Sequence, residues 1–415
     1  MNNLDRILSQ IESKANEKIE KTIKNIKIGK KGVLFLISPM GSCNFSCLYC
    51  SSYGYASKNT KMLDKEKIYK LAKLIIDFKN RYPYSYVNIS FHGYEPLQYP
   101  FDAFETLDNI IFNAGYHRIN SENPIRLSVQ TNGYLLDEEK IKFFYNRKWS
   151  IGISIDGPKE VHDAFRKTKD GKDTYDIIIH NINIYRKYFG KSPGIISVFT
   201  KKHLEIGPDK YYDWLLENKF TKVDIHVPLV PDGNPYVSQF YPNPKDTVKW
   251  FHELYEIWKN DKNPIDLHPF VSFINALVIG RGRDRACFLN NGCYKVIELG
   301  FDGKFRLCDR WSYITNKTID NIEKLEDIFY DDAFKTLFMR PFILKRFNNY
   351  CSNCKYFSIC LGGCSAEAKH SGKYLFNVMQ WAHSPNCYFI KNMYDLILKD
   401  LENKGYDIIK IYKSI

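Results

Sequence analysis

The chain lacks any long apolar segment. No stretch of roughly 18 or more consecutive apolar residues occurs in its 415 residues, and a membrane-spanning helix needs about that many. The first 21 residues, MNNLDRILSQIESKANEKIEK, also lack the apolar core of a secretory signal peptide. We therefore expect no membrane span and a cytoplasmic location.

The sequence also lacks internal repeats, low-complexity segments and a clustered basic run. The formal net charge is +13, but the lysines are spread along the whole chain, so we expect no nucleic-acid partner. Hydrophobic residues make up 44% of the chain and aromatic residues 15%, a composition that excludes a disordered protein. The length allows one barrel-sized domain and a smaller one.

Cysteine is absent between residues 51 and 286. Three of the 11 cysteines lie at positions 43, 47 and 50, and the other eight lie between 287 and 387. In a cytosolic chain, such groups of cysteines favour metal or redox chemistry over disulfides. The distribution therefore predicts two metal-binding regions on two domains.

Strand-like apolar runs alternate with amphipathic helical segments from residue 33 onward. Six consecutive strand–helix units predict an α/β fold with a parallel sheet, as a partial (β/α)6 TIM-like barrel. Catalytic groups in such folds lie on the loops that follow the strands. The predicted strands are Val33–Ser38, Tyr86–Phe91, Ile125–Val129, Ile151–Ile155, Gly194–Phe199 and Lys222–Val227, and the predicted helices are 64–79, 101–114, 137–147, 173–189, 208–218 and 244–260.

The chain divides into three predicted regions. Residues 1–30 have apolar residues at helical spacing, and we expect a helical extension docked on the main domain, although a role in substrate docking is also open. Residues 31–260 form the predicted barrel. The strand–helix rhythm ends near residue 260, so residues 261–415 form a second, small, Cys-rich domain.

The first cysteine group directly follows the first predicted strand. Cys43, Cys47 and Cys50 have the spacing C-x3-C-x2-C. Three thiolates can hold three irons of a [4Fe–4S] cluster and leave the fourth iron open for a small molecule. A zinc site or three buried cysteines are the alternatives, but zinc normally takes four ligands and no fourth Cys or His lies nearby in the sequence.

This motif, with aromatic Tyr49 before the last cysteine, resembles the radical S-adenosylmethionine (SAM) superfamily. The resemblance implies that the open iron binds SAM and that reductive cleavage yields a 5′-deoxyadenosyl radical. It also implies that the backbone of Tyr49 lies near the adenine, and that an external one-electron reductant is needed.

The segment after the second predicted strand, Gly93-Tyr94-Glu95-Pro96, resembles the G-G-E-P motif of that superfamily. The resemblance implies that Gly93 and Glu95 belong to the SAM site, with Glu95 accepting a hydrogen bond from the SAM ammonium. Tyr94 departs from the motif, because glycine permits a positive φ and a close backbone approach. We expect Tyr94 either to take another backbone shape or to fill space near the substrate.

Polar residues follow the third and fourth predicted strands as well. Asn132 belongs to Gln130-Thr131-Asn132-Gly133, and Ser154 precedes Asp156-Gly157-Pro158. The resemblance implies contacts of Asn132, Ser154 and Arg166 with the ribose or the carboxylate of SAM. Each segment alone also fits an ordinary turn, but the series at successive strand ends favours a site.

The second cysteine group resembles the SPASM domain of peptide-modifying radical SAM enzymes. Eight thiolates suffice for two fully ligated [4Fe–4S] clusters, which makes three clusters in the chain. A zinc ribbon is the alternative. The resemblance implies Cys287, Cys293, Cys308 and Cys364 as ligands of one auxiliary cluster and Cys351, Cys354, Cys360 and Cys387 as ligands of the other.

Asp309 directly follows Cys308, as in anaerobic sulfatase-maturating enzymes. The resemblance implies that Asp309 is a catalytic base. The alternative is an ion pair of Asp309 with Arg306 or Arg310, which would lower the pKa of the carboxyl and spoil a base.

The combined motifs indicate a radical SAM oxidoreductase that modifies a side chain of a peptide or protein. We slightly favour an oxidative crosslink in a ribosomal peptide, because Tyr94, Ser51 and Ser52 depart from the pattern of the sulfatase-maturating enzymes. Formylglycine formation from Cys or Ser, epimerisation and a small-molecule substrate are alternatives. An electron carrier without SAM cleavage is a further class, in which Glu95 would be dispensable.

Overall fold

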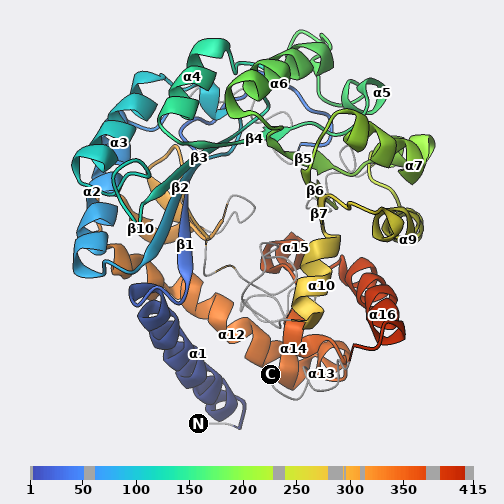
Figure 1. Cartoon of the computed structure of the whole chain (residues 1–415). Helices are drawn as coiled ribbons and strands as arrows, with labels where there is room; N and C mark the ends of the chain where they lie inside the picture. The colour runs from blue at the N-terminus through green and yellow to red at the C-terminus, as the bar shows by residue number, and fades with distance from the viewer. Residues whose placement is uncertain are drawn as a thin grey trace.

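A computed structural model describes residues 3–50, 61–227, 239–278, 293, 296–308, 314–370 and 384–406. Its centre is one sheet that curves around the molecule in Figure 1. Within the described residues, seven successive strands pair in parallel with their neighbours. The strands are β1 (Gly32–Ile37), β2 (Tyr86–Phe91), β3 (Arg126–Thr131), β4 (Ser150–Ser154), β5 (Gly194–Val198), β6 (Lys222–His226) and β7 (Asp266–His268). The predicted α/β class is confirmed.

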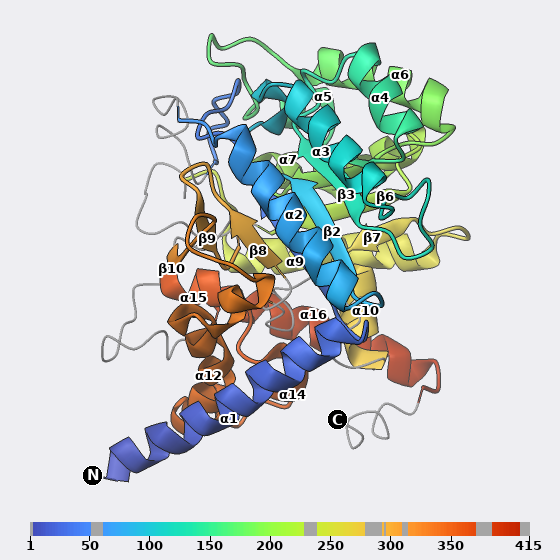
Figure 2. The same cartoon turned by 90° about the vertical axis from the view of Figure 1, so that its left-hand side faces the viewer.

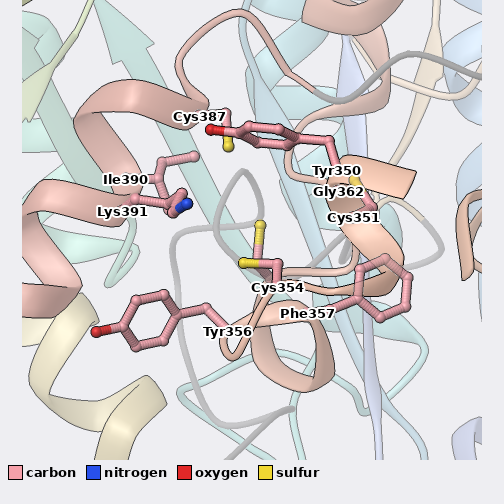
Figure 3. A pocket seen from close by; sticks show the side chains of 10 residues that line it. Tyr350, Cys351, Cys354, Tyr356, Phe357, Gly362, Cys387, Ile390 and Lys391 are labelled. Carbon is pink, nitrogen blue, oxygen red and sulfur yellow. The ribbon is translucent and has the colours of Figure 1, made fainter. Parts of the chain in front are cut away.

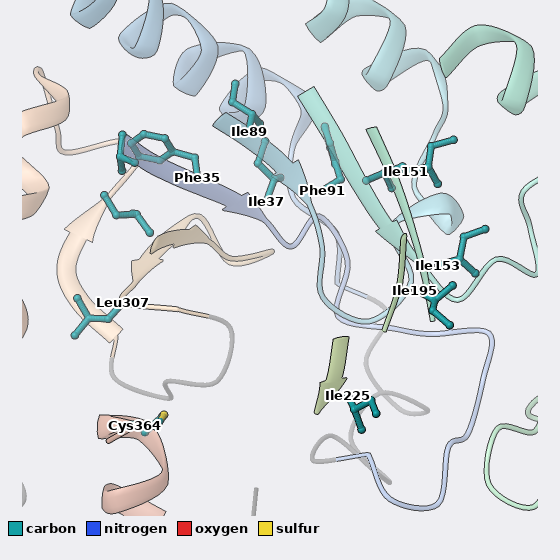
Figure 4. Close-up of a cluster of buried hydrophobic side chains, with 14 of the residues drawn as sticks. Phe35, Ile37, Ile89, Phe91, Ile151, Ile153, Ile195, Ile225, Leu307 and Cys364 are labelled. Carbon is teal, nitrogen blue, oxygen red and sulfur yellow. The ribbon is translucent and has the colours of Figure 1, made fainter. Parts of the chain in front are cut away.

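Amphipathic helices cover the outside of the sheet. In α2, the buried residues Ile68, Leu71, Ile75 and Phe78 recur at helical spacing and face the strands. Figure 4 shows buried strand side chains of the same hydrophobic cluster, among them Phe91. The helices are α2 (Lys65–Arg81), α3 (Asp102–Asn113), α4 (Glu138–Asn146), α5 (Lys159–His162), α6 (Tyr175–Phe189), α7 (Lys201–Glu217) and α9 (Pro244–Asn260), with the 3-10 turn η1 (Pro96–Gln98) after β2.

One predicted helix boundary was wrong, and the structure adds one strand to those predicted. The helix expected at 208–218 begins at Lys201, because a first helical turn precedes a kink at Gly207 (φ 80°) and Pro208. Six strands were expected, but β7 adds a seventh, and it is only three residues long. A run of that length carries no detectable alternation of apolar and polar residues.

The sheet continues into the C-terminal part of the chain. Strand β8 (Val296–Leu299) pairs in parallel with β1, and β9 (Lys304–Arg306) and β10 (Ile314–Thr318) follow as antiparallel strands. The order β10-β9-β8-β1-β2-β3-β4-β5-β6-β7 leaves the sheet open, with β10 and β7 at its edges. The backbone pairing therefore crosses the boundary expected near residue 260.

Helices of 4 to 17 residues make up most of the rest of the described C-terminal part, seen from the side in Figure 2. Helix α16 packs against α9 and α10. The helices are α10 (Phe270–Val278), η3 (Leu325–Tyr330), α12 (Asp332–Phe347), α13 (Asn349–Ser352), α14 (Phe357–Cys360), α15 (Ser365–His370) and α16 (Cys387–Asn403).

The predicted N-terminal helix is present as α1 (Asn3–Lys27). It packs on α12 and η3, and Figures 1 and 2 both show it alongside α12. Its buried residues Ile11, Ala15, Ile19 and Ile23 recur at helical spacing. The apolar stripe of α1 thus meets the C-terminal helices, and its buried residues Ala15, Ile19 and Ile23 belong to the same hydrophobic cluster as the strands of the sheet.

None of the helices in the described ranges is long and apolar enough to span a membrane.

Candidate functional site

The three-cysteine loop follows β1 and lies against the segment that follows α5. Backbone hydrogen bonds run from Ser46 N to Lys167 O (2.9 Å), from Leu48 N to Phe165 O (3.1 Å) and from Lys169 N to Asn44 O (3.2 Å). None of these six residues is a cysteine, so these hydrogen bonds support the loop through the backbone of the residues between and beside the cysteines. This pairing fixes the positions from which the thiols project.

The thiols of Cys43, Cys47 and Cys50 lie close enough together to act on one another electrostatically. Burial raises the pKa of Cys43 to about 12, and the charges of Glu95 and Cys50 add to the rise. Burial also raises the pKa of Cys47, with the charges of Cys50 and Cys43 adding to it. Thiols with such pKa values become thiolates only when a bound cation compensates the charge, as a cluster iron does.

The buried carboxylate of Asp156 contacts this loop through Tyr49. Asp156 accepts two hydrogen bonds from Arg166, at 2.9 Å from Nε and 3.0 Å from Nη2, and a third from the Tyr49 hydroxyl. Val198 N donates a fourth at 3.0 Å. The Arg166 guanidinium also lies 5.5 Å from the centroid of the Tyr49 ring. Tyr49 is thus fixed by contacts with β4 and β5 loops that lie far from it in the sequence.

The charges in this group stabilise one another. Burial by itself raises the pKa of Asp156, but Arg166 outweighs it, so the pKa lies below the usual range of an aspartate. The Asp156 backbone carbonyl accepts further hydrogen bonds from Ser197 Oγ (2.7 Å) and His203 Nε2 (2.8 Å). Sequence reasoning missed the role of Asp156, because Asp-Gly-Pro has the composition of an ordinary turn.

Glu95 is fully buried at the start of the turn after β2. Its Oε1 accepts hydrogen bonds from Leu97 N (3.0 Å) and Thr131 Oγ1 (2.7 Å), and its Oε2 accepts one from Asn132 N (2.7 Å). Burial raises the pKa of Glu95 to about 7, although these three donors oppose the rise. A carboxylate fixed in this way can accept a hydrogen bond from an ammonium group.

Asn132 connects Glu95 to the cysteine loop. Its Nδ2 donates to Asn44 Oδ1 (2.7 Å) and lies 3.9 Å from Cys43 Sγ. The structure therefore brings the predicted residues Glu95, Asn132 and Cys43 together at the carboxyl edge of the sheet.

The Ser154 hydroxyl lies at the end of β4 and accepts a hydrogen bond from Gln130 Nε2 (3.1 Å). Arg166, predicted at the same site, donates hydrogen bonds from Nε and Nη2 to the Asp156 carboxylate. Contacts of these residues with SAM stay predictions.

Tyr94 keeps the left-handed backbone that its glycine counterpart would favour. Its φ is 50° and that of Gly93 is 78°. The first of the two expectations for Tyr94, another backbone shape, was therefore wrong. The Tyr94 ring meets Phe301 edge to face at 6.0 Å, and a Cβ on Gly93 would lie 2.3 Å from Ser38 Oγ. Tyr94 and Phe301 thus lie together at the ends of β2 and β8.

Four C-terminal cysteines line one pocket, shown in Figure 3. The pocket holds about 320 Å3 of empty space, part of it open to solvent. Tyr350 and Lys391 lie at the same pocket, and Lys391 Nζ lies 5.0 Å from the Tyr350 ring centroid. The four cysteines are the ones that the resemblance implies for one auxiliary cluster: Cys351, Cys354, Cys360 and Cys387.

Cys293 and Cys364, implied for the other auxiliary cluster, also lie near each other. Burial raises the pKa of Cys293 to about 12, and the charge of Cys364 adds to the rise. Cys308 follows β9, whereas Cys287 lies outside the described residues. None of the ten described cysteines forms a disulfide. Within the same residues, no three His, Cys, Asp or Glu side chains converge on a single metal ion.

The predicted base Asp309 and its neighbour Arg310 also lie outside the described residues. Arg306, the alternative ion-pair partner predicted for Asp309, donates to Asp302 at 3.0 Å and 2.8 Å. The role of Asp309 stays a prediction.

Comparison with known proteins adds a sequence family and several relatives. Residues 37–204 match the radical SAM superfamily. The cysteine-type anaerobic sulfatase-maturating enzyme of Clostridium perfringens is 26% identical over 344 residues, which cover 79% of this chain and 88% of that protein. The serine-type enzyme of Bacteroides thetaiotaomicron is 25% identical over 361 residues, which cover 80% and 83%.

Solved structures share the fold. Native anSMEcpe with bound AdoMet superposes with a TM-score of 0.74 at 22% identity, over 92% of this chain and 99% of that one. Streptococcus suis SuiB bound to precursor peptide SuiA has a TM-score of 0.60 at 17% identity, over 89% and 79%.

Proposed function

Because the chain is a radical SAM enzyme, we propose that it oxidises a side chain of a peptide or protein substrate. The observation that carries this proposal is the connection of Glu95 through Asn132 to Cys43 at the carboxyl edge of the sheet. It couples a buried carboxylate to the loop that would hold the cluster. The similarity to sulfatase-maturating enzymes over about four-fifths of the chain supports a peptide or protein substrate.

The chain's own residues would bind and orient the cofactors. Cys43, Cys47 and Cys50 would hold a [4Fe–4S] cluster with one open iron, and Glu95 would accept a hydrogen bond from the ammonium of SAM. When bound, the cluster and SAM supply the 5′-deoxyadenosyl radical that takes a hydrogen atom from the substrate. Ser154 would donate to the ribose or carboxylate of SAM, and Asp156 would keep Tyr49 in place beneath it.

The eight C-terminal cysteines would hold two auxiliary clusters. Four of them line one pocket, and Cys293 lies near Cys364, which is the grouping that the family resemblance implies. Oxidation of a substrate removes a hydrogen atom and then one more electron and a proton. The cysteines that would hold the auxiliary clusters would thereby provide a one-electron acceptor for that step, and an external reductant would supply the electron that cleaves SAM.

Formylglycine formation is the first specific reaction to test. The preference for a crosslink rested on Tyr94 and on Ser51 and Ser52. Tyr94 keeps the backbone that glycine would favour, so that departure carries less weight, and both serines lie outside the described residues. Cysteine-type and serine-type sulfatase-maturating enzymes are both among the relatives. Asp309 would be the base that deprotonates the substrate thiol or hydroxyl.

A peptide crosslink is the second candidate. The paired rings of Tyr94 and Phe301 add aromatic surface beside Glu95 that a glycine would not provide. The fold similarity to SuiB, which was solved with its precursor peptide, fits this reading.

The test uses anaerobically reconstituted, reduced enzyme with SAM and a panel of Cys-, Ser- and aromatic-containing peptides. Deoxyadenosine and the accurate peptide mass are recorded together. Loss of two hydrogens from a Ser peptide, or the additional exchange of sulfur for oxygen in a Cys peptide, supports formylglycine. Loss of two hydrogens with a fragmentation block between two residues supports a crosslink. Deoxyadenosine without any peptide change across sulfatase-derived and aromatic peptides would argue for a small-molecule substrate.

Matched variants identify the residues responsible. A triple variant with Ala at Cys43, Cys47 and Cys50 should not form deoxyadenosine, and continued formation would refute the cluster site. Asp309→Asn should still form deoxyadenosine but should slow product formation, because a base acts only on the substrate. Equal losses of both products would refute Asp309 as the base.

A further inference from the structure

Arg340 is a buried cation in the C-terminal part of the chain. It lies on α12 and is 1% exposed. Its guanidinium donates to three successive carbonyls, at 3.3 Å to Leu361 O, 2.8 Å to Gly362 O and 3.1 Å to Gly363 O. Three carbonyls on one guanidinium fix the position of the charge, because its donors lie in a rigid plane.

The turn that presents these carbonyls has an uncommon backbone. Leu361, Gly362 and Gly363 all have positive φ angles, of 53°, 85° and 70°. A Cβ on Gly362 would lie 2.3 Å from Leu344 Cδ1 and 3.2 Å from Arg340 Nη2, so a larger residue would separate the turn from α12. The backbone strain of a non-glycine residue in this region persists only where the surroundings stabilise it. Arg340 supplies that stabilisation for Leu361.

This turn joins cysteines that belong to different predicted clusters. Cys360 ends α14 immediately before it, and Cys364 follows immediately after it. Cys360 lines the pocket shown in Figure 3, whereas Cys364 lies near Cys293. Arg340 is therefore fixed to the one short segment that connects the two sets of ligands.

The surroundings of Arg340 require compensating negative charge. Burial lowers the pKa of Arg340, and the sulfurs of Cys293, Cys364, Cys360 and Cys351 oppose this effect. These four cysteines come from both predicted clusters. A buried cation without a partner is costly, and ligated thiolates are the partner that this site offers.

We propose that Arg340 is a positioning residue and a shared counter-charge for both auxiliary clusters, held between them by the carbonyls of the Leu361–Gly363 turn. The inference rests on the auxiliary clusters of the proposed function. A fixed positive charge favours the reduced, more negative state of each cluster, so Arg340 raises both reduction potentials. It thereby makes the clusters better acceptors for the electron that leaves the substrate.

The experiment measures reduction potentials in the full-length chain with Ala at Cys43, Cys47 and Cys50. That background removes the SAM-binding cluster, so its signal does not overlap with the auxiliary clusters. Arg340→Gln and Arg340→Met remove the charge, and Arg340→Lys keeps it. Arg346→Gln is the matched control, because Arg346 lies exposed on the same helix. Iron content and potentiometric titration followed by electron paramagnetic resonance are measured for each variant.

The expected result is about eight irons in the background chain. Both neutral variants should be reduced at least tenfold less readily at a given potential, which is about 59 mV for a one-electron couple. Arg340→Lys and Arg346→Gln should keep the background potentials. Equal potentials in all variants with full iron content would overturn the inference while leaving the auxiliary clusters intact.

Two other outcomes are also decisive. If the neutral variants lose iron, Arg340→Lys should restore it, and an equal loss in Arg340→Lys would overturn the role of the charge. If the background chain itself binds no iron, the auxiliary clusters of the proposed function are refuted, and this inference with them.

Discussion

At the residue scale, Tyr94 shows how a departure from a motif can leave the backbone unchanged. A tyrosine stands where related motifs have glycine, yet its φ is 50°. The left-handed region costs an L-residue roughly 1–2 kcal/mol. The edge-to-face contact with Phe301 offsets part of that cost, since such pairs contribute about 0.5–1.5 kcal/mol.

Comparison of Tyr94→Gly with Tyr94→Ala isolates the backbone strain, because both variants remove the ring. Tyr94→Gly should be more stable than Tyr94→Ala by about 1 kcal/mol in urea unfolding. Lys148 is the positive control, because its φ of 57° is also in the left-handed region. Lys148→Gly should therefore be more stable than Lys148→Ala by the same amount. A Tyr94→Ala variant as stable as Tyr94→Gly would contradict the assignment of strain at this position.

The raised pKa of Glu95 predicts a pH dependence of SAM binding. Burial raises that pKa to about 7, so the carboxyl becomes protonated and loses its charge as the pH falls through 7. The dissociation constant for SAM should therefore rise by up to about tenfold per pH unit below 7 and stay flat above 8. Equilibrium binding to the reconstituted enzyme between pH 6 and 8.5 measures this. Glu95→Gln should bind weakly with no such slope, and a persisting slope would assign the titration to another group.

At the element scale, the cysteine loop depends on loops from other strands. The Asp156 carboxylate joins Tyr49 of that loop to Arg166, while Val198 N donates to it from β5. A loop held by such contacts has less conformational freedom to lose when a cofactor binds, which lowers the entropic cost of binding.

Asp156→Asn should destabilise the protein strongly, because it leaves Arg166 as a buried cation without a charged partner. The expected loss in the free energy of unfolding is about 3–5 kcal/mol. Asp176→Asn is the control, since Asp176 is an exposed partner of Lys159, and it should cost no more than about 0.5 kcal/mol. Denaturant unfolding at pH 8 compares the two. A loss below about 1 kcal/mol for Asp156→Asn would show that the ion pair is dispensable.

Helix α1 is a second element whose position follows from burial. Ile19 is 4% exposed at its contact with the C-terminal helices. Ile19→Ala should lower the free energy of unfolding by about 2–5 kcal/mol. Lys14→Ala, on the exposed side of the same helix, should change it by less than about 0.5 kcal/mol. Equal effects of the two variants would indicate that α1 does not dock as described.

At the scale of the whole molecule, one sheet spans the predicted barrel and the predicted Cys-rich region. Strand β8 pairs with β1, and β7 pairs with β6 beyond the expected boundary near residue 260. The first cysteine group, which follows β1, and Cys308 of the second group, which follows β9, are thereby attached to the same sheet. The distance between the predicted SAM site and the predicted auxiliary sites would then be set by strand pairing rather than by a linker.

A fragment of residues 31–260 should therefore fail to fold as a soluble domain. It would lose β8 beside β1 and β7 beside β6, and the two unpaired strand edges would favour aggregation. Its soluble yield and circular dichroism are compared with those of the full-length chain. A soluble, cooperatively unfolding fragment would show instead that the barrel is an independent domain.

The sequence alone determined the class of the fold and the grouping of the chemistry. Periodic apolar runs predicted six strands and most helix bounds to within a few residues, because the repeat of two or 3.6 residues is local information. Cysteine spacing separated a three-thiol group from an eight-thiol group for the same reason. Motif residues such as Glu95 and Asn132 were placed correctly at the strand ends, where the structure brings them together.

Only the tertiary structure decided which distant groups meet. The pairing of Asp156 with Tyr49 and of Arg340 with the Leu361–Gly363 turn joins residues that no local pattern connects. The same holds for β8 beside β1 and for α1 on α12. Burial and charge compensation depend on which residues are neighbours in space. The Asp156 carboxylate, for example, lies in a segment with the composition of a turn, but its hydrogen-bond donors Tyr49 and Arg166 come from other parts of the chain.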